Sequence, residues 1–109
     1  YKSLGVMAMT ELLDPPQYEK LVAGCRRIGL SDRDVHYYAE HITVDIGHAD
    51  GWLNNVIVPI GKKHPAAMEE VFFGAALRLQ TCNDYYDGLL AALQSLGGSL
   101  SSHSVPPSE

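Results

Sequence analysis

Apolar residues recur at spacings of three and four along most of the chain, which is the period of a helix with one buried face. Between positions 18 and 28, for example, the larger apolar residues are Tyr18, Leu21, Val22, Cys25 and Ile28. No segment shows the sustained alternation of apolar and polar residues that is typical of a half-buried strand. The sequence therefore predicts an all-α fold.

Helix-breaking residues divide this pattern in its first third. A helix is expected over residues 4–13, and Asp14-Pro15-Pro16 is expected to end it, because a proline disfavours helical backbone in the residue before it. The two prolines suit the first turn of a second helix, which runs to about Ile28. Gly29 is the predicted stop of that helix.

Two longer helices follow. Ser31 and Asp34 have the spacing of an N-cap with an acidic third residue, so a third helix is expected from there to about Val58. A fourth is expected from about Pro65 to Leu96, with Gly97-Gly98 as its stop. Residues 1–96 would then form one helical domain, and the Ser- and Pro-rich residues 97–109 a disordered tail.

Composition excludes several classes of protein. The 109 residues include 8 Lys and Arg against 13 Asp and Glu, a net charge of -5, which argues against a nucleic-acid partner. No apolar run is long enough to cross a membrane, and no signal peptide opens the chain. The two cysteines, without a C-x-x-C, indicate neither a thiolate zinc site nor a redox pair. We expect a cytoplasmic protein.

Three potential metal ligands share one face of the third expected helix. At about 100° per residue, His41, Asp45 and His48 lie within an arc of about 60°. Tyr37 and Trp52 extend the same stripe, so aromatic residues frame the three polar side chains. The alternative is a structural role, since a histidine on an apolar face is more often a hydrogen-bonded core residue than a ligand. Three such residues in one row favour a metal site.

The chemistry and spacing of these side chains restrict the kind of site. Imidazole nitrogen and carboxylate oxygen are suitable ligands for zinc, iron and manganese. Positions i, i+4 and i+7 span roughly 10 Å of helix, which is long for three ligands of one ion. That spacing suits two ions with the carboxylate of Asp45 between the histidines.

Glu11 is the fourth candidate ligand. It is the sole carboxylate among residues 4–13, in an otherwise apolar helix. Acidic side chains are rarely buried unless they are paired or bound to a metal. If its helix faces the row of His41, Asp45 and His48, Glu11 completes a set of ligands from two helices.

These residues resemble a known family. The segment GLSDRDVHYYAEHITVDIGHADGW is similar to the C-terminal ligand helix of the haem-oxygenase-like dimetal oxidases, many of which are described as iron-containing redox enzymes. MTELLDPPQYEKLVAGCRRIGL looks like that family's glutamate-donating helix, with Glu11 in the matching place. The resemblance covers residues 4–93 and implies an up-and-down helical bundle. About four of its helices would lie in this chain as the C-terminal half.

The resemblance also implies an activity. Such a protein would be an O₂-activating oxidase or oxygenase with two ferrous ions, although manganese accepts the same ligands. Its ligands here would be Glu11, His41, Asp45 and His48. Family members act on fatty acids, amino acids and related small molecules. Five residues are predicted to line a substrate pocket: Tyr37, Trp52, Phe73, Gly74 and Leu77.

The ligand set is expected to be incomplete in this chain. In the family, a further Glu and His come from N-terminal helices that have no counterpart here. The chain would then be a fragment, or a partner chain, possibly in a homodimer, would complete the bundle. Two alternatives remain: a metal-independent relative of thiaminase II or pyrroloquinoline-quinone synthase, and a non-catalytic helical interaction module.

Overall fold

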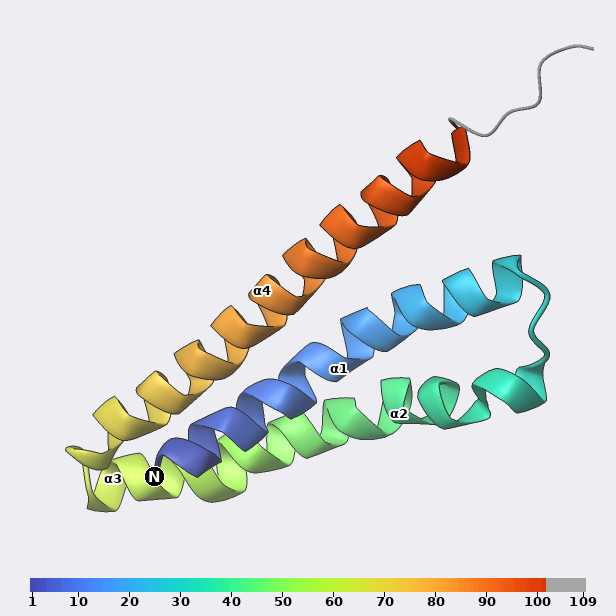
Figure 1. Ribbon diagram of the computed structural model, residues 1–109. Helices are drawn as coiled ribbons and strands as arrows, with labels where there is room; N and C mark the ends of the chain where they lie inside the picture. Colours follow the sequence, from blue (N-terminus) through green and yellow to red (C-terminus); the bar gives the residue numbers. More distant parts are fainter. Residues whose placement is uncertain (102–109) are drawn as a thin grey trace, which may run out of the picture. The chain divides into compact units, whose positions relative to one another are not determined.

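All regular structure in the described part of the chain is helical. The computed structural model describes residues 1–101, with side chains up to residue 98. Its elements are α1 (Lys2–Arg27), α2 (Asp32–Gly51), the π-helical segment η1 (Trp52–Ile57), α3 (Val58–Lys63) and α4 (Ala67–Ser101) (Figure 1). The all-α prediction is confirmed. The chain divides into two compact units, one of residues 1–78 and a second that begins at Leu79.

The expected break at Asp14-Pro15-Pro16 is wrong. α1 continues through both prolines, so the first two expected helices are one and the chain has three long helical segments rather than four. An internal proline removes a backbone hydrogen bond and costs about 3 kcal/mol. Contacts on both sides of the prolines hold α1 against α2, Glu11 to His48 before them and Tyr18 to Tyr38 after them. We attribute the continuity of α1 to this packing.

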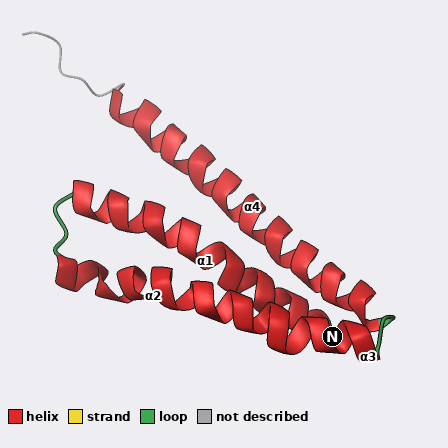
Figure 2. Cartoon of the chain, turned by 180° about the vertical axis from the view of Figure 1, so that it is seen from behind, coloured by secondary structure: helices red, strands yellow, loops and turns green. Residues whose placement is uncertain are grey.

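α1 and α2 run antiparallel and lie side by side in both views (Figures 1 and 2). The turn between them is fixed by Gly29, whose φ of 90° lies in the left-handed region that favours glycine. The N–H of Gly29 donates to the Arg26 carbonyl at 3.0 Å, and the N–H of Leu30 donates to the Cys25 carbonyl at 3.1 Å. This pair of bonds is a Schellman motif, and the predicted stop at Gly29 is confirmed.

α2 begins with the capping box that the sequence predicts. The N–H of Asp34 donates to the Ser31 hydroxyl at 3.4 Å, and the N–H of Ser31 donates to the Asp34 carboxylate at 2.8 Å. The Ser31 hydroxyl also donates to that carboxylate at 2.7 Å. These hydrogen bonds lower the pKa of Asp34 below its ordinary value. The start of the helix that carries the candidate ligands is therefore fixed locally.

Replacing Ser31 with alanine is expected to destabilise the protein by about 0.5–2 kcal/mol at neutral pH, because α2 loses its cap. Since the pKa of Asp34 is lowered in the folded state, its contribution is present above its unfolded pKa of about 3.9 and is lost as the pH falls through the folded value. Thermal unfolding of both proteins between neutral and acidic pH tests this. If the difference in stability between the wild type and the Ser31 variant grew as the pH fell, the capping box would be contradicted.

A π-helical segment interrupts the helix that carries the candidate ligands. α2, η1 and α3 follow one another without a break, and the N–H of Val58 donates to the carbonyl of Leu53, five residues earlier. The expected end near Val58 is therefore wrong, because the helix continues to Lys63. Pro59 has no N–H and its ring would clash with the carbonyl four residues earlier. The wider turn before Pro59 accommodates it.

Two glycines let α1 approach the first turns of α4 closely. A Cβ atom on Gly5 would overlap the carbonyl oxygen of Val71, and one on Gly74 would overlap the carbonyl oxygen of Lys2. Both glycines are buried. The contact is reciprocal, because each helix presents a glycine to the backbone of the other.

The end of α4 also differs from expectation. The helix continues past Gly97-Gly98 to Ser101, so those glycines are not its stop. Residues 102–109 of the predicted tail lie outside the described part of the chain. Among the described helices, none is both long enough and apolar enough to cross a membrane.

Candidate metal centre

Three of the four predicted ligands meet between α1 and α2. The Nδ1 atom of His48 lies 3.2 Å from Oδ1 of Asp45 and 3.3 Å from Oε2 of Glu11. One ligand atom from each residue lies within 4.8 Å of the others, a separation that a single ion could bridge. We call these residues the Glu11–Asp45–His48 cluster.

Asp45 is the buried member of the cluster. The residue is 2% exposed, whereas the His48 side chain is 54% exposed. Its Oδ2 atom is buried and has no hydrogen-bond partner in the described part of the chain. A buried carboxylate oxygen without a partner costs free energy unless a cation or a donor neutralises it. The donor set of two carboxylates and one imidazole fits a divalent transition metal.

His41, the remaining predicted ligand, is not part of this cluster. Its Nδ1 atom lies 2.7 Å from the carbonyl oxygen of Tyr37. A carbonyl only accepts, so Nδ1 is the donor in this hydrogen bond, and the neutral ring in this tautomer has a lone pair on Nε2. Metal-binding histidines usually donate their second ring N–H to a carbonyl or carboxylate in this way. His41 is therefore in the tautomer that a ligand needs, and its role as a ligand stays a prediction.

Asp14 is a carboxylate near the candidate site that the sequence pattern did not single out. Burial raises the pKa of its carboxyl, the charge of Asp45 raises it further, and Arg78 and His41 lower it. Asp14 therefore lies within electrostatic reach of both Asp45 and His41. The sequence pattern predicts that the helix ends at Asp14. In a continuous helix, its spacing of three from Glu11 places Asp14 on the same face as Glu11.

Arg78 brings positive charge to this group of carboxylates. Its Nε–H donates to the hydroxyl of Thr10 at 3.0 Å, and that hydroxyl donates to the carbonyl of Val6 at 2.9 Å. The guanidinium also lowers the pKa of Asp14. The turn of α1 that carries Glu11 is thus tied to the first turns of α4 by a part-buried hydrogen bond.

Replacing Asp14 with asparagine is expected to raise the melting temperature of the metal-free protein slightly at neutral pH. A carboxyl whose pKa is raised on folding favours the folded state when protonated, and this contribution is lost as the pH rises through the folded value. The gain in melting temperature should therefore vanish below the unfolded pKa of about 3.9. Melting curves of both proteins across this range check the sign. A variant that melts lower at neutral pH would show that the attraction of Arg78 dominates.

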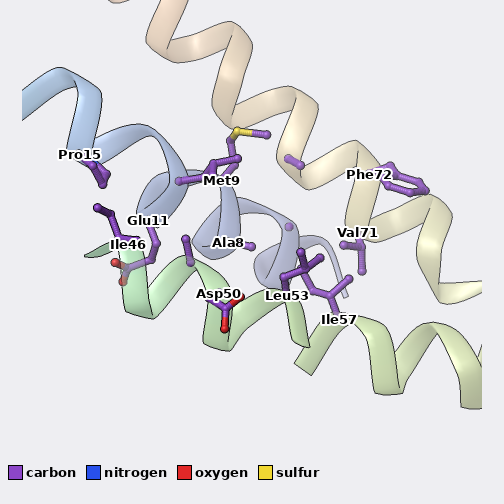
Figure 3. A pocket seen from close by; sticks show the side chains of 14 residues that line it. Ala8, Met9, Glu11, Pro15, Ile46, Asp50, Leu53, Ile57, Val71 and Phe72 are labelled. Carbon is purple, nitrogen blue, oxygen red and sulfur yellow. The ribbon is translucent and has the colours of Figure 1, made fainter. Parts of the chain in front are cut away.

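An apolar cavity of about 540 Å³ adjoins the cluster (Figure 3). Glu11 belongs to both, and its carboxylate reaches from α1 toward α2 near Ile46. Apart from Glu11 and Asp50, the lining residues are uncharged, and most are apolar: Gly5, Ala8, Met9, Leu12, Pro15, Ile46, Ala49, Leu53, Ile57, Val71, Phe72 and Ala75. A metal bound at Glu11 would lie at the wall of this cavity.

The five residues predicted to line a pocket, Tyr37, Trp52, Phe73, Gly74 and Leu77, are not among those that line this cavity. Three of them have other contacts. Tyr37 stacks on His41, Phe73 lies under the ammonium group of Lys2 at 5.2 Å, and Gly74 packs against the backbone of Lys2. Helical periodicity does not say which side of a helix its neighbours leave open, so these five residues stay a prediction for the substrate pocket.

Comparison with known proteins shows the family of this chain. Residues 1–82 match the family model described as iron-containing redox enzyme, and the chain belongs to this family. The matched range spans Glu11, His41, Asp45 and His48, whose roles as ligands stay a prediction, and the description of the family supports an oxidoreductase with iron.

One relative is the 4-chloro-allylglycine synthase of Streptantibioticus cattleyicolor, which is 30% identical over 88 residues. The aligned region is 81% of this chain and 34% of that enzyme, so the chain spans about a third of the length of the relative it matches. No solved structure matches the chain.

Proposed function

We propose that this chain supplies the C-terminal ligands of a two-iron, O₂-activating site in an oxidase or oxygenase of a small organic substrate. The observation that carries the proposal is the Glu11–Asp45–His48 cluster, with the buried, unpartnered Oδ2 of Asp45, at the wall of an apolar cavity. Family membership supports the iron and the redox chemistry.

The ligands divide between two positions. Glu11, Asp45 and His48 would hold one ion, since their ligand atoms already lie within 4.8 Å of one another. His41, one turn before Asp45 on α2, would bind the second ion, and Asp45 would serve both ions, since its Oδ2 atom has no hydrogen-bond partner among the described residues. When bound, the irons supply the redox chemistry of O₂, which no protein side chain performs as readily.

The residues around the ions would control what reaches them. Apolar side chains of the cavity exclude water and accept an apolar part of the substrate beside Glu11. Asp50, the other charged residue of the lining, accepts a hydrogen bond from Asn54 at 2.8 Å. The substrate proposed on this basis is a small molecule with an apolar segment, which would lie next to the ion held by Glu11.

Further helices are proposed to complete the site. Leu12, Ile46 and Leu53 line the cavity and are 59%, 61% and 52% exposed. Neighbouring apolar side chains this exposed usually mark a surface that another element covers. The relative is about three times as long as the aligned region. We propose that the remaining helices, or a partner chain, cover this surface and supply the additional Glu and His that the resemblance implies.

Anaerobic titration of the full-length protein with ferrous iron tests the proposal. We expect about two iron ions per chain, as in dimetal-carboxylate bundles, followed by O₂ uptake. His48→Ala should lose iron, whereas His64→Ala, on the exposed residue between α3 and α4, should keep it. Less than one iron ion per wild-type chain, or activity without metal, would favour the metal-independent alternative.

A further inference from the structure

Three tyrosines and a candidate ligand form a closed group of aromatic rings beside the metal centre. Tyr37 stacks on His41 with ring centroids 4.1 Å apart, and Tyr18 meets His41 edge-on at 6.3 Å. Tyr38 lies against both tyrosines, 5.2 Å from Tyr18 and 5.3 Å from Tyr37. We call these four residues the four-ring cluster.

The four-ring cluster joins the interior to the surface. Tyr18 and Tyr38 are half-buried, whereas Tyr37 is 58% exposed. Tyr18 comes from α1 and the other three rings from α2, so the cluster crosses the interface that holds the candidate ligands. Adjacent rings at these separations are close enough for fast single-electron transfer. The shortest route for an electron between the candidate ligand His41 and solvent runs through Tyr37, which stacks on His41.

Oxidation of a tyrosine releases a proton as well as an electron, so the path needs a proton acceptor. Tyr37 is 58% exposed, and water can accept its proton.

We propose that Tyr18, Tyr37 and Tyr38 form a path along which single electrons reach the metal centre from the surface. The inference rests on the proposed function, because iron and O₂ at that centre would supply the one-electron oxidant. A tyrosine gives one electron to this oxidant and one proton to water, which leaves a tyrosyl radical. The radical settles at Tyr37, where an external one-electron donor and a solvent proton restore the phenol.

Paired phenylalanine variants test the path, because phenylalanine keeps the packing ring and removes the oxidisable phenol. The test variant is Tyr18→Phe with Tyr37→Phe, which changes both rings that contact His41. The matched control is Tyr85→Phe with Tyr86→Phe, a tyrosine pair on α4 with ring centroids 5.2 Å apart. The full-length, iron-loaded proteins are mixed with O₂, frozen at successive times, and examined by electron paramagnetic resonance.

We expect a tyrosyl signal in the wild type that changes shape when ring-deuterated tyrosine is incorporated. The signal should be lost in the Tyr18/Tyr37 variant and retained in the Tyr85/Tyr86 control. Without added reductant, peptide mass spectrometry should find oxidised tyrosine first at Tyr37, the exposed end of the path.

Two results would overturn the inference, and they bear differently on the proposed function. If the wild type binds iron and consumes O₂ with neither a tyrosyl signal nor oxidised tyrosine, the path does not exist although the metal centre does. The same holds if the Tyr18/Tyr37 variant keeps the wild-type signal. If the wild type binds no iron, the proposed function fails and the path fails with it.

Discussion

Replacing Asp45 with asparagine is expected to abolish tight iron binding and to leave the fold intact. The amide has nearly the shape of the carboxylate but lacks its charge, and one of its two terminal atoms cannot bind a cation. Loss of a supporting residue around a metal typically costs about 10–100-fold in affinity. Loss of this buried ligand should cost at least as much, because Asp45 belongs to the cluster and is proposed to serve both ions.

Stability measurements separate this effect from unfolding. Without metal, the melting temperature of the Asp45 variant should change little, because one buried atom without a partner replaces another. With ferrous iron at about 100 times its dissociation constant, the wild type should gain about 2.7 kcal/mol, and the variant should gain almost nothing. His36→Ala is the control, since His36 lies 3.7 Å from Glu40 on an exposed face of α2. Equal stabilisation of both variants by iron would exclude Asp45 as a ligand.

Placing a methyl group at the contact of α1 with α4 is expected to destabilise the protein strongly. In Gly5→Ala the new Cβ atom would overlap the Val71 carbonyl oxygen and lie 2.8 Å from the Ala75 nitrogen. Both atoms belong to helical backbone, which cannot move aside as the end of a side chain can. Overpacking of this kind typically costs about 1–3 kcal/mol. Because the overlapping atoms are rigid backbone, we expect the cost of Gly5→Ala to lie at the upper end of this range.

Gly24→Ala is the matched control for Gly5. Gly24 lies in the same helix, and no described atom outside its local backbone would come within 4 Å of its Cβ. That substitution should stabilise by about 0.4–1 kcal/mol, because it restricts the unfolded chain. Thermal and urea unfolding of both variants should therefore show shifts of opposite sign. If Gly5→Ala is also stabilising, the close approach of the two backbones is absent in solution.

Local sequence predicts the helical content and the row of candidate ligands. Periodicity alone predicts the all-α fold, and the Ser31–Asp34 capping box and the Gly29 stop depend on interactions within a few residues. The positions of His41, Asp45 and His48 on one face follow from the pitch of a helix. Such features are decided by residues close together in the chain, so the sequence carries them without reference to the rest of the molecule.

Local rules failed where distant contacts oppose them. Pro15 and Pro16 favour a break, yet packing against α2 keeps α1 continuous and thereby brings Asp14 to the site. Gly97-Gly98 likewise does not end α4, because glycines weaken a helix without necessarily ending it. In both cases, proline or glycine disfavours helix by about 1–3 kcal/mol, and the prediction from sequence treats this cost as the fixed end of a helix.

What the sequence determined by itself is the chemistry of the candidate ligands and the helix face on which three of them lie. Only the tertiary structure decided which of them meet: Glu11 lies opposite Asp45 and His48, whereas His41 stands apart among tyrosine rings. It also decided that the cavity opens beside Glu11 and not beside the aromatic stripe. The physical reason is that helical pitch fixes directions around one axis, while distances between helices depend on how their side chains and glycines pack.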